Sequence, residues 1–188
     1  MAPPVFIYTG AVSNPKPIFL VGMMGAGKST VGPRLAARLG RAFLDADSDI
    51  EHRAGRTIAE IFARDGESHF RRLEREAIEA IAGEPVVVAL GGGAIAQPGA
   101  VERLRASGTV VYLDVSIDRL LERIGDAEGR PLLAGLDPVE RAAKLEVLLE
   151  VRGPYYAAAH LRVDASGSPE ETAERIDDWL SGREIADP

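Results

Sequence analysis

The sequence alternates short apolar runs with longer segments in which apolar residues recur every three or four positions. The short runs are rich in β-branched and aromatic residues and favour buried strands, while the longer segments have the period of amphipathic helices. This alternation is typical of β-α crossover units around a mostly parallel sheet. It predicts five strands, at residues 18–21, 42–45, 86–90, 109–113 and 161–163.

Several helix starts are marked by residues that cap helices. Thr57 with Glu60 has the pattern of a capping box, and Asp137 and Ser168 each precede a proline. Together with the strands, these marks predict an α/β protein with three layers, α/β/α, around a five-stranded parallel sheet.

The domain organisation that we expect is simple. At 188 residues, the chain has room for one domain, which we place at residues 17–182. Residues 1–16 lack the basic and apolar stretches of a signal peptide, so we interpret them as a flexible tail, and residues 183–188 as a second one. The glycine-punctuated segment at about 125–137 has the length of a mobile lid.

Composition excludes several classes of function. With 29 acidic against 22 basic residues, the formal net charge is −7, which disfavours a nucleic-acid or anionic-membrane surface. No apolar run approaches the roughly 20 residues that span a bilayer. The absence of cysteine rules out thiolate catalysis and disulfides, and it suits a reducing compartment. We therefore expect a cytoplasmic protein without nucleic-acid or membrane partners.

A phosphate-binding pattern follows the first predicted strand. Residues 22–29 read G-x-x-x-x-G-K-S and lead into a helical segment, which is the context that distinguishes a P-loop from a chance match. Such a loop aims backbone N–H groups at phosphates, its lysine reaches the β- and γ-phosphates, and its serine ligates Mg²⁺. The predicted ATP-binding residues here are Gly25, Ala26, Gly27, Lys28, Ser29 and Thr30.

Two carboxylates follow the second predicted strand. Asp45 and Asp47 are expected at the carboxyl edge of the sheet, where open α/β proteins bind ligands. A carboxylate there can order Mg²⁺ through water or accept a proton from an attacking hydroxyl. Alternatively, Asp47, Ser48 or Asp49 caps the next helix, with Asp49 the favoured cap.

From about residue 18 to residue 180, six motifs in a fixed order resemble those of the shikimate kinase family. They are the P-loop, Asp45-x-Asp47, Phe70-Arg71-x-x-Glu74, Gly91-Gly92-Gly93, Arg130-Pro131-Leu132-Leu133 and Arg152-x-Pro154-x-Tyr156. The resemblance implies a P-loop fold like that of nucleoside monophosphate kinases. It also implies a Mg²⁺-dependent transferase that uses ATP to phosphorylate the 3-hydroxyl of shikimate, giving shikimate 3-phosphate on the chorismate branch of aromatic amino-acid biosynthesis.

The same resemblance implies how the acceptor is bound. Arg71 and Arg152 would hold the shikimate carboxylate with two planar forks, a geometry that suits a carboxylate better than lysines do. Glu74, one helical turn after Arg71, would brace that arginine. The alternatives are an ordinary exposed ion pair for Glu74 and plain surface charges for the arginines. Arg72 and Arg75 match no motif and are interpreted as solvent-facing.

The resemblance also assigns the catalytic centre. Asp47 would hold the substrate hydroxyls and act as general base, while Asp45 would support Mg²⁺ through water. Backbone N–H groups of Gly92 and Gly93 would bind a hydroxyl or a phosphate oxygen, because glycines let a ligand approach closely. The alternative for the glycines is a loop shaped only by backbone geometry.

Further residues are assigned by the resemblance. Phe62 and Phe70 would wall the substrate ring, or alternatively serve only as core. Arg130, in the predicted lid, would cover the γ-phosphate and stabilise charge in the transition state. Arg123 and Pro169 would lie near the adenine.

One departure from the family pattern concerns the metal site. Ala89 and Leu90 stand just before the glycines, where many P-loop proteins carry a second Mg²⁺-supporting acid, so that role shifts toward Asp45. Two other readings stay open: another small P-loop kinase, such as a gluconate or nucleoside monophosphate kinase, and a non-catalytic nucleotide-binding module. We expect a monomer whose partners are ATP and shikimate.

Overall fold

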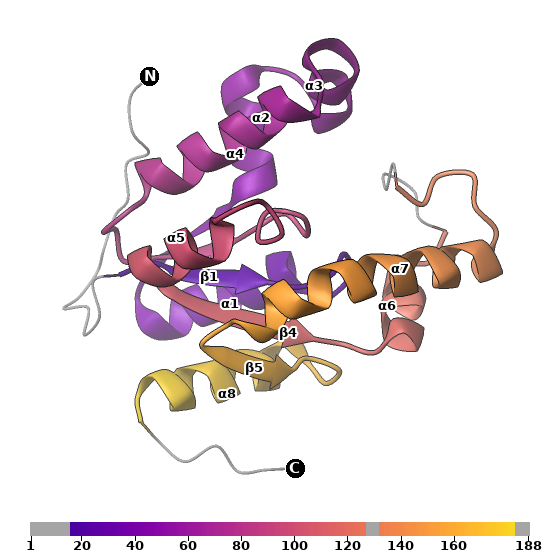
Figure 1. Cartoon of the computed structure of the whole chain (residues 1–188). Coiled ribbons are helices and arrows are strands. Elements are labelled where there is room, and N and C mark those ends of the chain that lie inside the picture. Colours follow the sequence, from indigo (N-terminus) through magenta and orange to yellow (C-terminus); the bar gives the residue numbers. More distant parts are fainter. Residues whose placement is uncertain (1–15, 127–131, 183–188) are drawn as a thin grey trace.

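The computed structural model describes residues 16–126 and 132–182, and five parallel strands form its centre (Figure 1). In sheet order β2-β3-β1-β4-β5, each strand pairs in parallel with its neighbours, which confirms the predicted α/β class. The strands are β1 (Ile18–Val21), β2 (Ala42–Asp45), β3 (Val86–Ala89), β4 (Thr109–Asp114) and β5 (Leu161–Asp164).

Helices cover both faces of this sheet. Figure 1 shows α1 and α8 along one face and α5 and α7 over the other, while α2, α3 and α4 stand together at one end. The capping box expected at Thr57 is present. Asp137 and Ser168 cap their helices as expected, and each also forms a capping box with a glutamate three residues on. The helices are α1 (Lys28–Leu39), α2 (Ala46–Ala54), α3 (Ile58–Asp65), α4 (Glu67–Ala80), α5 (Ala100–Ser107), α6 (Ile117–Ile124), α7 (Pro138–Ala157) and α8 (Pro169–Leu180).

The core explains the apolar strands. Every residue of β1 and β3 is buried, because the central strands of a parallel sheet have helices on both faces. Helix α1 approaches β2 so closely that a Cβ atom on Gly32 would lie 2.1 Å from the Phe43 ring. A second apolar cluster, comprising Ile50, Ile61, Phe70 and Ala77, joins α2, α3 and α4.

Strand order brings the predicted motifs to one edge. β3 lies between β2 and β1, with Ala89 opposite Asp45 on one side and Leu20 on the other. The segments that leave the carboxyl ends of these strands are the P-loop, the aspartate pair and the glycine triplet. They are therefore neighbours in space although they are far apart in sequence.

Some expectations fall outside the described residues. The expected N-terminal tail, apart from Lys16, and the C-terminal tail lie there, as do residues 127–131 of the expected lid, which include Arg130. Leu133, which belongs to the same expected lid, is fully buried in the core. Among the described helices, none is both long enough and apolar enough to cross a membrane.

Candidate active site

The P-loop takes its shape from glycines whose positive φ angles disfavour any other residue. Gly22 has φ 145° and Gly27 has φ 96°, and a Cβ atom on Gly22 would lie 2.7 Å from a backbone oxygen of Leu113. Helix α1 begins at Lys28, whose Nζ donates to the carbonyl oxygens of Gly22 and Met23, both at 2.9 Å. The lysine ammonium thus lies across the loop at the positive end of a helix.

A cavity of about 570 Å³ opens over this loop. Its wall brings together most of the residues expected to bind ATP and metal with the aspartate expected to act on the acceptor, so a nucleotide and an alcohol have a common space. It is lined by Met24, Gly25, Ala26, Gly27, Lys28, Ser29, Thr30, Val31, Asp45, Asp47, Ala89, Leu90, Gly91, Gly92, Arg123, Ala165, Gly167, Pro169 and Thr172.

Asp45 links the P-loop to the start of α2. The Ser29 hydroxyl donates to its Oδ2 at 2.5 Å, and its Oδ1 accepts from the Ser48 N–H at 3.3 Å. Asp45 is therefore the cap of α2, and the expectation that Asp47, Ser48 or Asp49 fills this place is wrong. Because strand and helix join without a loop, the last strand residue supplies the cap, and Asp49 pairs instead with Arg53 at 2.7 Å.

Asp47, in the first turn of α2, carries an uncommitted oxygen. Its Oδ1 is buried and has no hydrogen-bond partner among the described residues, and a Cβ atom on Gly91 would lie 2.8 Å from it. Burial raises the pKa of Asp47 above its ordinary 3.8, and the charge of Asp45 adds to the rise, while Lys28 opposes it. The carboxylate is thus placed beside the glycine triplet with a free acceptor position and increased basicity.

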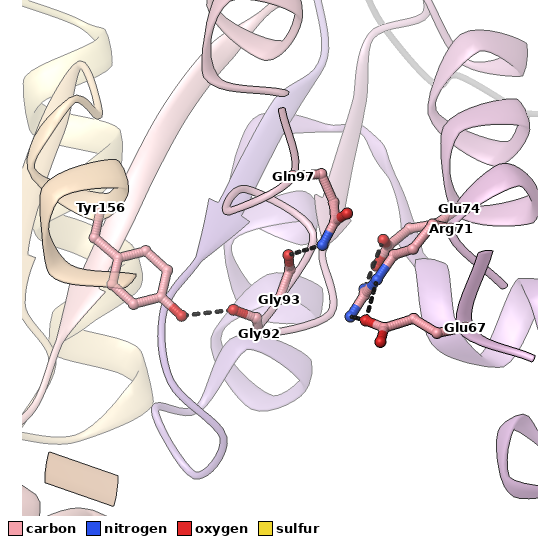
Figure 2. Close-up of polar contacts among 7 residues, drawn as sticks. All are labelled: Glu67, Arg71, Glu74, Gly92, Gly93, Gln97 and Tyr156. Atoms are coloured by element: carbon pink, nitrogen blue, oxygen red, sulfur yellow. Dashed lines mark hydrogen bonds and ion pairs between the residues drawn. The ribbon is translucent and has the colours of Figure 1, made fainter. Parts of the chain in front are cut away.

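Arg71, on α4, is fixed by acids of its own helix (Figure 2). Its Nη1 donates to Glu74 Oε2 at 2.9 Å, and its Nη2 donates to Glu67 Oε1 at 3.1 Å. Glu74 is 2% exposed, so this is a buried brace rather than an exposed ion pair. Burial raises the pKa of Glu74 even though Arg71 beside it lowers it.

Two guanidinium groups meet over the glycines. A Cβ atom on Gly93 would lie 3.1 Å from Arg71 Nη2 and 3.6 Å from Arg152 Nη2, and one on Gly92 would lie 3.2 Å from Arg152 Nη1. Arg71 comes from α4 and Arg152 from α7. Both positive groups therefore lie beside Gly93, and they come from different helices. Arg152 also lies beside Gly92, whose Cβ position is 3.4 Å from the Gly22 oxygen of the P-loop.

Phe62 and Phe70 differ in burial. Phe70 is buried in the apolar cluster of α2, α3 and α4, whereas Phe62 is 37% exposed, and their ring centroids lie 4.9 Å apart. Arg71 lies over the Phe70 ring, with its Cζ atom 5.2 Å from the centroid. Phe70 therefore serves the core and supports the arginine at once.

Arg123, on α6, ties the two sides of the nucleotide cavity together. Its guanidinium donates to the carbonyl oxygen of Ala26 in the P-loop at 3.4 Å and to that of Ala165 at 2.8 Å. Pro169 begins α8 a few residues further on and lines the same cavity.

Some contacts of the site carry no local sequence signal. The sequence does not predict three hydrogen bonds: Arg71 to Glu67, Gln97 to the Gly93 carbonyl oxygen, and the Tyr156 hydroxyl to the Gly92 carbonyl oxygen. Only Tyr156 belonged to a motif, and the motif indicated no partner for it. Among the described residues, no group of three or more His, Cys, Asp or Glu side chains is arranged to hold a metal ion.

Comparison with known proteins decides the family. The family model described as shikimate kinase matches residues 24–181. The chain belongs to the shikimate kinase family. Shikimate kinases of Synechococcus sp. (strain RCC307) and Mycobacterium avium (strain 104) are 49% and 52% identical to it. These alignments cover 88% and 78% of this chain and 84% and 82% of the relatives.

Solved structures agree with this membership. Shikimate kinase from Acinetobacter baumannii in complex with shikimate is 38% identical, with a TM-score of 0.83 over 91% of this chain and 95% of that one. Shikimate kinase from Bacteroides thetaiotaomicron is 35% identical, with a TM-score of 0.84 over 88% and 98%. The expected family, fold and reaction are confirmed: this is a shikimate kinase, which phosphorylates shikimate with ATP as co-substrate.

Proposed function

We propose that this shikimate kinase seats the acceptor carboxylate between Arg71 and Arg152 and activates the 3-hydroxyl with Asp47. The observation that carries the proposal is the meeting of both guanidinium groups at Gly93, next to Gly92 and the P-loop. A ring held by its carboxylate at this point would direct its hydroxyls toward Asp47, whose unpartnered Oδ1 lies 2.8 Å from the Cβ position of the adjacent Gly91.

The seat suits an acid for physical reasons. Planar guanidinium forks bind carboxylates through paired, charge-assisted hydrogen bonds, which are stronger than neutral ones. Arg71 is held in place by Glu67 and Glu74, so little conformational entropy remains to be lost when the ligand binds. Arg152 brings the second guanidinium group from α7 to the same glycines.

Asp47 suits the role of base. Its buried Oδ1 can accept a hydrogen bond from a substrate hydroxyl without displacing a protein partner. A raised pKa makes the carboxylate a better proton acceptor once it is ionised. As the hydroxyl oxygen attacks the γ-phosphorus, its proton passes to Asp47 and the bond from the γ-phosphorus to the bridging oxygen of ADP breaks.

The nucleotide side requires a divalent cation, and the residues present fit Mg²⁺. Ser29 and Asp45 place a hydroxyl and a carboxylate in direct contact at the cavity wall, and oxygen donors are the ligands that Mg²⁺ takes. We assign Ser29 as a ligand and Asp45 as its support through water. When bound, the ion would neutralise charge on the phosphates. Lys28 would turn from the loop carbonyls to the β- and γ-phosphates.

The remaining assignments complete the proposal. Arg123 and Pro169 border the adenine side of the cavity, and Arg130, which lies outside the described residues, would act from the lid at about 125–137. Residues 17–182 would form one catalytic domain that works as a monomer, since α4, α7 and the P-loop of a single chain supply the site. A location in the cytoplasm suits substrates that are small and charged.

A coupled assay of ADP release tests the function. Shikimate should give turnover with ATP and Mg²⁺, whereas gluconate and nucleoside monophosphates should give none above the rate without acceptor. An absence of shikimate-dependent ADP release would refute the proposal, and preference for gluconate would favour the rival small-molecule kinase.

Replacement of Lys28 by alanine should lower kcat much more than it raises the KM for shikimate. The ammonium stabilises charge on the transferred group, and loss of one such contact costs about 10²–10³-fold in kcat. Steady-state kinetics with both substrates measure this. Lys144→Ala, an exposed lysine of α7, is the control and should leave kcat unchanged; a kcat for Lys28→Ala within twofold of wild type would remove the lysine from the phosphate site.

A further inference from the structure

The two glycines between the arginines are held by hydrogen bonds to their carbonyl groups (Figure 2). The Tyr156 hydroxyl donates to the Gly92 oxygen at 2.7 Å, and Gln97 Nε2 donates to the Gly93 oxygen at 3.4 Å. Glycine has no side chain with which to anchor itself and samples more conformations than other residues. The direction of these peptide groups therefore depends on side chains that come from elsewhere in the fold.

Tyr156 is itself well fixed. It is 1% exposed, and its ring stacks on Tyr112 of β4 with centroids 4.9 Å apart and planes at 9°. Its hydroxyl also lies 3.8 Å from Met23 Sδ in the P-loop. Burial raises the pKa of Tyr156 to about 12, although the charge and side-chain hydrogen bond of Arg152 lower it, so the hydroxyl remains a hydrogen-bond donor at neutral pH.

One hydrogen bond of this kind determines where an N–H group points. The Gly92–Gly93 peptide is trans, and in a trans peptide the N–H points away from the C=O. Because the Gly92 oxygen is held toward Tyr156, the Gly93 N–H points to the opposite side, where Figure 2 places Arg71. Within the described residues, neither glycine N–H donates to a backbone acceptor.

We propose that Tyr156 is a positioning residue for shikimate, holding the Gly92–Gly93 peptide so that the Gly93 N–H faces the acceptor. Tyr156 acts on the same dipeptide as Arg152, which stands four residues earlier on the same face of α7. One helix thus supplies both a guanidinium for the ligand and a hydroxyl that shapes the loop beneath it. The inference rests on the proposed function.

Tyr156→Phe tests this assignment, because it removes one hydroxyl and keeps the ring and its stacking. The KM for shikimate should rise about fivefold, the size of one lost neutral hydrogen bond. The KM for ATP should change less than twofold, since the P-loop keeps its shape. Steady-state kinetics in both substrates, with melting curves to verify folding, give these values.

Tyr112→Phe is the matched control. It also deletes a buried tyrosine hydroxyl, one that donates to Asp114 at 2.8 Å, but this hydroxyl does not contact the glycines. Its KM for shikimate should therefore equal that of wild type. A KM for shikimate within twofold of wild type in Tyr156→Phe would overturn the inference. So would a KM for shikimate that rises equally in Tyr156→Phe and Tyr112→Phe, or a KM for ATP that rises as much as the KM for shikimate in Tyr156→Phe. Wild-type turnover with shikimate tests the proposed function separately.

Discussion

Replacement of Asp47 by asparagine should lower kcat with shikimate by about 10²–10⁴-fold, the contribution of a positioned general base. Asparagine keeps the size of the side chain and can still contact a hydroxyl, but it cannot accept the proton. The KM for ATP should change little, because the P-loop remains intact. Single-turnover measurements would show the loss in the chemical step.

The same substitution should not destabilise the fold at neutral pH. Because the pKa of Asp47 is raised on folding, the folded state binds the proton more tightly than the unfolded chain does. The stabilisation that this group contributes is therefore fully present below pH 3.8, the ordinary pKa of an aspartate. It is lost as the pH rises through the raised pKa of Asp47 in the folded state. At pH 7, Asp47→Asn should melt at a temperature equal to or above that of wild type, and the difference should shrink toward acidic pH.

Ionisation of Asp47 should raise activity, although it lowers the stability of the fold. The base must be ionised, so kcat/KM should rise with pH through the raised pKa of Asp47, at a higher pH than an ordinary aspartate would give. A pH profile of kcat/KM measures this. If kcat/KM fell on the acidic side with the ordinary pKa of an aspartate, burial would not raise the pKa of Asp47 in the free enzyme.

Asp49→Asn is the control for Asp47. It lies two residues on in α2 and forms an ion pair with Arg53 at 2.7 Å. It should lose some stability and keep kcat within about twofold of wild type. The reverse pattern, with activity lost at Asp49 and kept at Asp47, would move the base by two residues.

Replacement of Arg71 by alanine should raise the KM for shikimate by at least about thirtyfold, since truncating one partner of a buried charge pair costs ~2–5 kcal/mol. It should also destabilise the fold, because Glu74, 2% exposed, loses its ion-pair partner. Arg71→Lys separates the two effects. It keeps the positive charge but loses the planar fork, so the KM should still rise while the melting temperature falls less.

Arg72→Ala is the matched control on the same helix. Its side chain is 55% exposed and its ion pair with Glu76 spans 3.6 Å, so the pair contributes little. Its KM for shikimate should match that of wild type. If Arg71→Lys bound shikimate as well as wild type does, the carboxylate would not lie between the two guanidinium groups.

Much of the fold could be predicted because local pattern and global structure agree. The strands at 18–21 and 42–45 have the predicted bounds, and the other three differ by one residue at their ends. These runs are apolar because the sheet is covered on both faces. The P-loop was equally visible, since its glycines, lysine and serine lie within one short segment.

Contacts that depend on distant segments could not be predicted in this way. The bond from Tyr156 to Gly92 joins residues 64 positions apart. Likewise, the sequence offers Asp47, Ser48 and Asp49 as helix caps and favours Asp49, whereas the direct join of β2 to α2 selects Asp45. Local sequence indicates which side chains can bond, while the packing of the sheet and helices decides which ones do.

In the proposed complex, an acid seated by two arginines presents its 3-hydroxyl to Asp47 and the γ-phosphate. Phosphorus–proton correlation NMR of the product formed from shikimate and ATP tests it most directly. We predict one phosphorylated product, with the phosphorus coupled to the proton on carbon 3. Phosphate on another hydroxyl, or no phosphorylated shikimate, would contradict the account.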